Sequence, residues 1–347
     1  MSIPLQSPRA SRLLLSFGLL FAACSFASAQ QFQVTDHWKI PGQGRWDYLT
    51  VDPAAHLLYL THGDAVEAID TKTGKIAGTI SGLKGVHGVA LDPAGQEGYI
   101  SDGADNTVVV FDRHTFVVKQ KIAAGTNPDG IAYDPSTATV WAFNGRSKNA
   151  TVIDTQSKQV VATIALPGKP EFPAADGKGA VFANIEDMNE IVRIDANTHA
   201  ITATWPLAPC ESPSGLAMDR ANRRLFSVCD GKIMAVVNAD TGAVIAKVTI
   251  GDGPDAVAYD AKRKLVFASN GDGTLTVVKQ KSPDAYEVLQ NVTTQKSART
   301  LALDSATGAI YLAAAEFGPR PAAAADNPHP RPQSLPGTFV VLVVKAK

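Results

Sequence analysis

Apolar and polar positions alternate along most of the chain in short runs, and the same order of runs recurs seven times at intervals of about 42 residues. Each copy has an apolar run that ends in Asp, a second apolar run, and a third that ends in Asp-Thr or an equivalent pair. β-Branched and aromatic residues dominate the runs, while Gly, Pro, Asn and Asp fill the joints, as in short strands joined by tight turns. The first Asp falls at Asp52, Asp92, Asp134, Asp176, Asp219, Asp260 and Asp304.

The second copy illustrates the predicted strands. They cover residues 88–92, 98–101, 107–112 and 117–122. Beyond the first 29 residues, no stretch of the sequence has convincing helical periodicity. A repeat of this length with four strands is typical of a β-propeller blade, a unit that buries its apolar faces only against its neighbours. The pattern therefore predicts an all-β protein, a seven-bladed β-propeller with four-stranded blades.

The two ends of the chain are complementary. The last copy has its third strand at 339–344 and then stops, whereas a strand-like segment at 32–40 precedes the first copy. We predict that this N-terminal strand completes the last blade and closes the ring, because closure pairs two sheet edges that would otherwise be exposed. Residues 30–347 would then form a single domain. The Gly-His and Trp-Asp pairs of WD repeats do not recur in the sequence, so we do not expect that subclass.

The N-terminus has the pattern of a secretory signal peptide at residues 1–29. Two Arg residues precede an apolar stretch at 13–26, and Ala27-Ser28-Ala29 supplies the small-residue cleavage pattern. We expect cleavage after Ala29 and a periplasmic or secreted protein. An apolar stretch of about 14 residues is shorter than the ~20 needed for a permanent membrane helix, so no transmembrane span is expected. A lipid anchor on Cys24 is an alternative, which Phe21 disfavours because an aliphatic residue usually stands there.

Charge and cysteine content narrow the choice of partners. The sequence has 32 basic and 33 acidic residues, a balance that gives no general attraction to nucleic acid or anionic lipid. We expect a monomer. Export would place the chain in an oxidising compartment, where Cys210 and Cys229 of the fifth copy, at the same end of neighbouring strands, could form a disulfide. Two free buried thiols are the alternative.

Two neighbouring turns are rich in basic residues. Merged on one face, they could contact phosphate groups. No aromatic residues lie between them, however, so they offer no platform on which bases could stack. We therefore favour solvated turns over a nucleic-acid site. The residues are Arg220, Arg223, Arg224, Lys262, Arg263 and Lys264.

Four short segments resemble a known repeat family. They are Leu58-Tyr-Leu-Thr-His62, Gly98-Tyr-Ile-Ser-Asp102, Val140-Trp-Ala-Phe-Asn144 and Val266-Phe-Ala-Ser-Asn270. Each precedes a strand such as 151–155, and together they resemble the YVTN-repeat family. From about residue 31 to 347 the chain is similar to the exported, YncE-like, seven-bladed members. This resemblance implies the propeller fold but supplies no catalytic motif, and a fold alone does not imply a function.

The aligned copies differ most at one position. Five residues before the first Asp of each copy, six of the seven residues are ionisable, and in a propeller this position faces the mouth of the central channel. The seven side chains would therefore converge, and we predict that they bind a small molecule or a metal ion. They are Asp47, His87, Asp129, Glu171, Ser214, Asp255 and Arg299.

A second position, at the end of the next strand, emerges on the same face. It adds His62 and Asp102 to Asp47, His87 and Asp129 as a possible metal cluster. Imidazole with carboxylate suits zinc, iron, manganese or copper, whereas carboxylates alone suit calcium. Carboxyl groups close together would also have raised pKa values, which suits general acid or base chemistry.

The seventh copy contains an insertion of about 20 residues between its second and third strands. Loops of this length in compact domains are usually functional or disordered. The insertion is rich in Pro and would leave from the face that carries the ionisable residues, so it could cover the channel mouth and bring Glu316, Arg320 and His329 to the site. A mobile loop that binds no ligand is the alternative.

The sequence thus favours an exported β-propeller that binds a small molecule or a divalent metal ion at its channel mouth. A metal-assisted hydrolase or lactonase-like enzyme at the same site stays open, as does a scaffold that binds a protein partner. The ionisable residues could also be purely structural, since polar side chains at a wet channel mouth hold water and join blades by hydrogen bonds.

Overall fold

The computed structural model describes residues 1–4, 31–42, 45–93, 95–322 and 330–347. The chain divides into two units, Met1–Gln30 and Gln31–Lys347, and all seven repeats lie in the second. Nearly all of the expected signal peptide, including Cys24, lies outside the described residues. The described part of the chain contains no helix that is long and apolar enough to cross a membrane.

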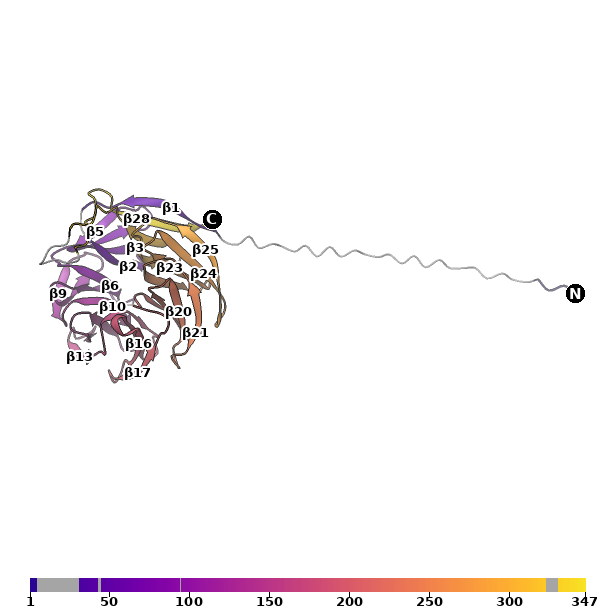
Figure 1. The fold of residues 1–347 in the computed structure, drawn as a ribbon, viewed down its shortest axis with the longest axis horizontal. Helices are drawn as coiled ribbons and strands as arrows, with labels where there is room; N and C mark the ends of the chain where they lie inside the picture. Colours follow the sequence, from indigo (N-terminus) through magenta and orange to yellow (C-terminus); the bar gives the residue numbers. More distant parts are fainter. Residues whose placement is uncertain (5–30, 43–44, 94, 323–329) are drawn as a thin grey trace. The chain divides into compact units, whose positions relative to one another are not determined.

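Seven four-stranded antiparallel sheets make up the second unit (Figure 1). Blade 1 contains β2 (Trp46–Asp52), β3 (Leu57–His62), β4 (Ala65–Asp70) and β5 (Ile76–Ile80), and blade 2 contains β6 (Val86–Leu91), β7 (Glu97–Asp102), β8 (Thr107–Asp112) and β9 (Val118–Ala123). Blade 3 contains β10 (Pro128–Asp134), β11 (Thr139–Asn144), β12 (Asn149–Asp154) and β13 (Val160–Ala165). Blade 4 contains β14 (Pro170–Ala175), β15 (Ala180–Ile185), β16 (Glu190–Asp195) and β17 (Ile201–Pro206), with a 3-10 turn, η1 (Glu186–Met188), between β15 and β16.

The remaining blades follow the same order, except the last. Blade 5 contains β18 (Leu216–Asp219), β19 (Arg224–Cys229), β20 (Ile233–Asn238) and β21 (Val244–Thr249), and blade 6 contains β22 (Pro254–Asp260), β23 (Leu265–Asn270), β24 (Thr274–Ser282) and β25 (Ala285–Thr293). Blade 7 contains β26 (Thr300–Leu303), β27 (Ile310–Ala314), β28 (Val340–Ala346) and, outermost, β1 (Phe32–Lys39). The inner strands β2, β6, β10, β14, β18, β22 and β26 contact one another in turn, and β26 contacts β2. The seven-bladed all-β ring is therefore confirmed.

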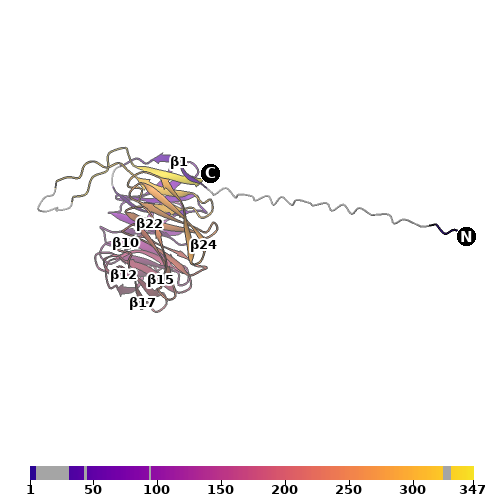
Figure 2. The same cartoon turned by 45° about the vertical axis from the view of Figure 1, so that its right-hand side comes forward.

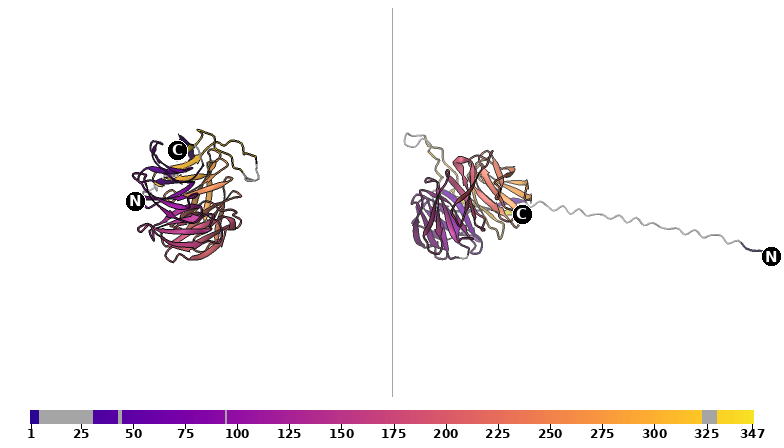
Figure 3. Two further views of the ribbon diagram at one scale, coloured as in Figure 1. Left: turned by 90° about the vertical axis from the view of Figure 1, so that its left-hand side faces the viewer. Right: turned by 90° about the horizontal axis from the view of Figure 1, so that it is seen from below.

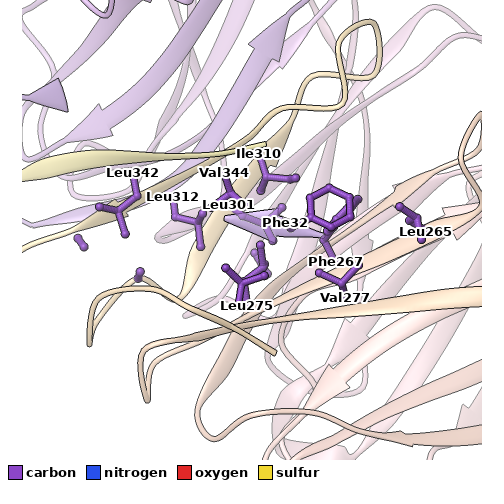
Figure 4. Close-up of a cluster of buried hydrophobic side chains, with 14 residues drawn as sticks. Phe32, Leu265, Phe267, Leu275, Val277, Leu301, Ile310, Leu312, Leu342 and Val344 are labelled. Carbon is purple, nitrogen blue, oxygen red and sulfur yellow. The ribbon is translucent and has the colours of Figure 1, made fainter. Parts of the chain in front are cut away.

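The N-terminal strand closes the ring as predicted. β1 pairs antiparallel with β28, with Phe32 opposite Ala346 and Lys39 opposite Val340. The Phe32 side chain is buried in a cluster with residues of blades 6 and 7, and its ring centroid lies 5.3 Å from that of Phe267 (Figure 4). β1 thus joins the two ends of the chain and also packs against the preceding blade.

The recurring Asp residues hold the turns. The Asp52 carboxylate accepts hydrogen bonds from the backbone N–H groups of Ala54 and Ala55, each at 3.1 Å, and Asp304 accepts one from Ala306 at 2.9 Å. An Asp side chain that bonds the backbone two or three residues later stabilises a tight turn. This role explains why the same residue type stands at the end of the first strand in each copy.

Glycine allows the inner strands to approach one another closely. A Cβ atom on Gly130 would lie 2.5 Å from the Glu171 carbonyl oxygen, and one on Gly215 would lie 2.7 Å from the Asp255 carbonyl oxygen. Real Cβ atoms do not make contacts this short. The small residues beside the ionisable position therefore set how near the neighbouring site residues lie.

Blade 5 contains a disulfide between Cys210 and Cys229, whose Cα atoms are 5.5 Å apart. The basic turns nearby are largely neutralised. Arg223 contacts Asp176 at 2.7 Å, Arg224 contacts Asp284 at 2.6 Å, and Arg263 contacts Asp260 at 2.7 Å. Most of these guanidinium groups are thus engaged in ion pairs within the protein, which leaves little unpaired positive charge for a phosphate group.

Candidate functional site

The predicted site residues lie where the inner strands begin, at irregularities in strand pairing. In five blades the register between the first and second strands shifts at this point, and such β-bulges turn a side chain away from its regular direction. The backbone is fixed there by hydroxyl groups of the second strand: the Asp47 N–H donates to Thr61 Oγ1 at 3.0 Å, and Ser101 Oγ donates to the Asp129 carbonyl at 2.6 Å. The shifted segments carry Asp47, His87, Asp129, Glu171 and Asp255.

Three of these side chains form a compact cluster. His87 Nδ1 lies 2.7 Å from Asp47 Oδ2 and 3.5 Å from Asp129 Oδ1. One ligand atom from each residue lies within 4.8 Å of the other two. Two ligands of one zinc ion at about 2.1 Å each can be about 4.2 Å apart at most. A side-chain movement of roughly half an ångström would therefore bring all three onto one ion.

The imidazole of His87 is in its doubly protonated, positively charged form at neutral pH in the metal-free protein. Burial by itself lowers its pKa, but the hydrogen bond that the ring Nδ1–H donates to Asp47 and the charges of Asp129, Asp47 and Glu171 outweigh burial and raise the pKa to about 9. Gly103 backs the ring, since a Cβ at this position would lie 2.6 Å from the imidazole Cδ2 and Nε2 atoms. The cluster therefore holds one cation now, the imidazolium, between two carboxylates.

The ionisable residues at the channel mouth, here called the ionisable ring, also form ion pairs outside this cluster. Lys169 Nζ contacts Glu171 Oε1 at 2.6 Å and also pairs with Glu186, while Arg299 Nε lies 3.2 Å from Asp255 Oδ2. Burial, followed by the charge of Asp129, raises the pKa of Glu171 to about 8. Burial raises the pKa of Asp255 to about 7, although Arg299 opposes this shift.

Tyr48 lies among the acidic residues of the ring. It is 5% exposed, and burial together with the charges of Asp255, Glu171, Asp47 and Asp129 raises its pKa well above the usual value. Its ring centroid is 4.5 Å from that of Phe172. The two aromatic rings thus add buried apolar surface beside the acidic groups.

Other predicted residues have different surroundings. His62 is not part of the three-residue cluster: it is 7% exposed and packs on Phe339, with ring centroids 4.3 Å apart. Asp102 is also outside the cluster, and its buried carboxylate accepts the Lys84 N–H at 2.7 Å. Ser214 belongs to the ring, but its hydroxyl donates to the Pro254 carbonyl at 3.1 Å and so joins blades 5 and 6.

The seventh-blade insertion connects β27 to β28. Its two arms are joined by a bridge between Phe317 and Ser334, and the described parts extend beyond the blades (Figures 2 and 3). Arg320 lies on the wall of a cavity of about 700 Å³ that also includes Asp47 and His87. Glu316 is exposed at the base of the loop, where its backbone N–H donates to Thr338 Oγ1 at 3.1 Å. His329 lies outside the described residues.

Several residues around the site were not predicted from the sequence. Tyr48 and Phe172 had a visible signal, because the same position in the other copies carries a smaller residue. Lys169 and Arg45 also share one aligned position, two residues before the ionisable one, where the other copies carry Gly, Ser or Asn, so this pair of basic residues was a signal that was missed. Trp46 lines the cavity from the position just before Asp47.

No protein-family model matches the chain, and no curated protein matches it. Solved structures with the same fold include a chain of Kuenenia stuttgartiensis hydrazine synthase, with a TM-score of 0.70 and 16% identity over 79% of this chain and 94% of that one. The WD40 repeats of RRP9 give 0.76 at 10% identity, covering 91% and 100%, and U3-55K gives 0.74 at 10%, covering 90% and 98%. At these identities the similarity shows the β-propeller fold alone.

Proposed function

We propose that this chain is an exported propeller, related to the YncE-like members of the YVTN-repeat family, that binds a divalent transition-metal ion at its channel mouth. The observation that carries the proposal is the convergence of Asp47, His87 and Asp129 at the edge of a cavity. One imidazole and two carboxylates suit zinc or manganese better than calcium, which prefers oxygen ligands alone. Three protein ligands would leave coordination positions open towards the cavity.

Binding of the metal must compete with the proton on His87. The ligand nitrogen has to be deprotonated, and its pKa of about 9 means that metal binding releases a proton near neutral pH. Affinity should therefore rise with pH up to about 9. The metal ion would replace the imidazolium as the cation between the two carboxylates. The two negative charges are therefore compensated both with and without metal.

The test is calorimetric titration of Zn²⁺ and Mn²⁺ into chelator-treated mature protein at about pH 8, combined with elemental analysis of the untreated protein. We expect one site per chain, and we expect His87→Gln and Asp129→Asn each to weaken binding by about tenfold or more. Asp105→Asn is the matched control, because this carboxylate lies outside the cluster and pairs with Lys84 and Lys121. Equal affinity in the two cluster variants and the wild type would contradict the proposal.

A second candidate, a metal-assisted hydrolase, is favoured by one observation. Glu171 and Asp255 have pKa values of about 8 and 7, which are in the range of a general acid or base at neutral pH. If the protein is an enzyme, turnover should depend on the metal and fall in Glu171→Gln while metal affinity stays unchanged. A loss of metal binding in that variant would assign Glu171 to the metal site instead.

A further inference from the structure

The cavity beside the metal cluster has an unusual concentration of arginine. Its walls include Arg45 from the segment before β2, Arg299 from blade 7, and Arg320 and Arg331 from the two arms of the insertion. Its volume of about 700 Å³ falls in the range of small-molecule sites, which is roughly 300–1,000 Å³. Segments that are far apart in the sequence thus bring four arginine residues to one cavity.

Most of this positive charge has no counter-charge in the described part of the chain. Arg299 pairs with Asp255 through Nε, but no described carboxylate pairs with Arg45, Arg320 or Arg331. Elsewhere in the protein, Arg113 and Arg223 each contact a carboxylate. Unpaired guanidinium groups at a shared cavity are the arrangement that proteins use to bind carboxylate and phosphate.

The charges of these arginines act on one another. Partial burial lowers the pKa of Arg45 from its usual value, and the charges of Arg331 and Arg299 lower it further. The acidic residues of the same wall are already engaged: Asp47 contacts His87 at 2.7 Å, and Asp64 accepts the Gly85 N–H at 2.9 Å. An anion in the cavity would therefore reduce repulsion among the arginines, and Arg45 and Arg331 have no described carboxylate partner for it to displace.

One side of the cavity is aromatic. Trp46 and Phe317 lie with their ring centroids 5.8 Å apart, and Trp46 also packs against the buried Phe339 at 5.0 Å. Phe317 is 42% exposed, which is high for a large apolar residue. Its position is fixed at the base of the insertion, where the Gly318 N–H donates to the Gln333 carbonyl at 2.9 Å. A flat apolar group could cover this exposed ring surface.

We propose that the cavity binds a small aromatic anion, whose carboxylate or phosphate group contacts Arg45, Arg299 and Arg331 and whose ring lies against Trp46 and Phe317. This inference rests on the proposed binding function of the same face and specifies its ligand class. The positive charge of the arginines selects a ligand with an acidic group, and the aromatic wall selects a ligand with a flat ring. Asp47 and His87, two members of the proposed metal site, form the adjoining wall of the cavity.

The experiment uses the mature protein in chelator, so that anion binding is measured without metal. The probes are benzoate and phenylphosphate, with neutral benzamide and ring-free acetate as comparisons, titrated by calorimetry at low ionic strength. We expect benzoate or phenylphosphate to bind at least about tenfold more tightly than benzamide and acetate, and we expect added salt to weaken binding. The two anionic probes distinguish a carboxylate ligand from a phosphate ligand.

Three variants and a control identify the site. Arg45→Gln and Arg331→Gln should each weaken binding of the preferred anion by about tenfold, and Phe317→Ala should reduce its advantage over acetate. Arg193→Gln makes the same change of charge away from the cavity, where Arg193 bonds the Thr202 hydroxyl at 2.7 Å, and should have no effect. The proposal is overturned if benzamide binds as well as benzoate, if no probe binds at millimolar concentration, or if both arginine variants bind normally. Separate titration with Zn²⁺ shows whether the metal proposal stands or fails by itself.

Discussion

At the scale of single residues, the environment of His87 decides how the site behaves without metal. The imidazole contacts two carboxylates that are each less than one quarter exposed, so its positive charge is stabilised and its pKa is raised to about 9. A lone histidine at a channel mouth would more often be neutral at physiological pH. The same contacts that stabilise the proton also place the ligand atoms for a metal ion.

We predict that the His87 resonance of the metal-free protein titrates near pH 9 in an NMR titration. Asp47→Asn should lower this pKa, because it removes the hydrogen bond at 2.7 Å and one negative charge. His87→Gln identifies the resonance. A His87 resonance that titrates near the unperturbed value of 6.5 in the wild type would show that the cluster does not hold an imidazolium.

The pKa of His87 also affects stability, and the sign follows from proton binding. The folded state holds the proton more tightly than the unfolded state, so this contribution is fully present below about pH 6.5 and is lost as pH rises through about 9. Between these values the slope is about 1.4 kcal/mol per pH unit for one proton. Urea unfolding of the wild type and of Asp47→Asn should therefore differ most at the acidic end of this window.

At the scale of strands, the hydrophobic pattern predicted the elements closely. Blade 2 was expected to have an outer strand at 117–122, and β9 is Val118–Ala123. Its inner strand was expected at 88–92, but β6 begins at Val86 because a bulge continues the pairing past the site residue. A period of two residues carries no information about such a bulge, so the sequence could not predict how His87 is oriented.

The site shows the same division between pattern and geometry. Aligning the copies predicted that the ionisable residues converge, because equivalent positions in a ring face one axis. It could not predict that His62 packs on Phe339, since Phe339 follows the long insertion and is brought to blade 1 only by ring closure. The partners of a side chain across blades depend on tertiary packing, which the repeat pattern does not encode.

The disulfide is an element-scale constraint within blade 5. It joins Cys210, in the segment before β18, to Cys229 at the end of β19, a sequence separation of 19 residues. A cross-link over a loop of this size typically contributes about 3 kcal/mol to stability. We predict that replacing both cysteines by alanine lowers the free energy of unfolding in urea by about this amount. Reducing agent should destabilise the wild type but not the double variant; a wild-type midpoint that is indifferent to reductant would contradict a structural role.

At the scale of the whole molecule, closure of the ring of blades depends on the pairing of β1 with β28, the two strands at the ends of the propeller. β1 pairs with β28 along its length, and the Lys347 N–H donates to the Gln31 carbonyl at 2.7 Å. The Phe32 backbone N–H also donates to Gln290 Oε1 of blade 6 at 2.9 Å. Because the first and last described residues of the propeller are hydrogen-bonded, its two ends can be joined without moving any blade.

This adjacency predicts the outcome of two rearrangements. Removing residues 31–39 should expose the edge of β28 and leave a cavity where Phe32 packs. Truncation of a buried Phe side chain alone typically costs about 3–5 kcal/mol of stability, so we expect a large fall in Tm and aggregation. A circular permutant that moves the same residues behind Lys347, through a short Gly-rich linker, should instead fold with nearly the wild-type Tm. Thermal unfolding and size-exclusion chromatography compare the three proteins. Closure would lose its role in stability if the deletion variant stayed monomeric with an unchanged Tm, because the fold would then hold without the strand that completes blade 7.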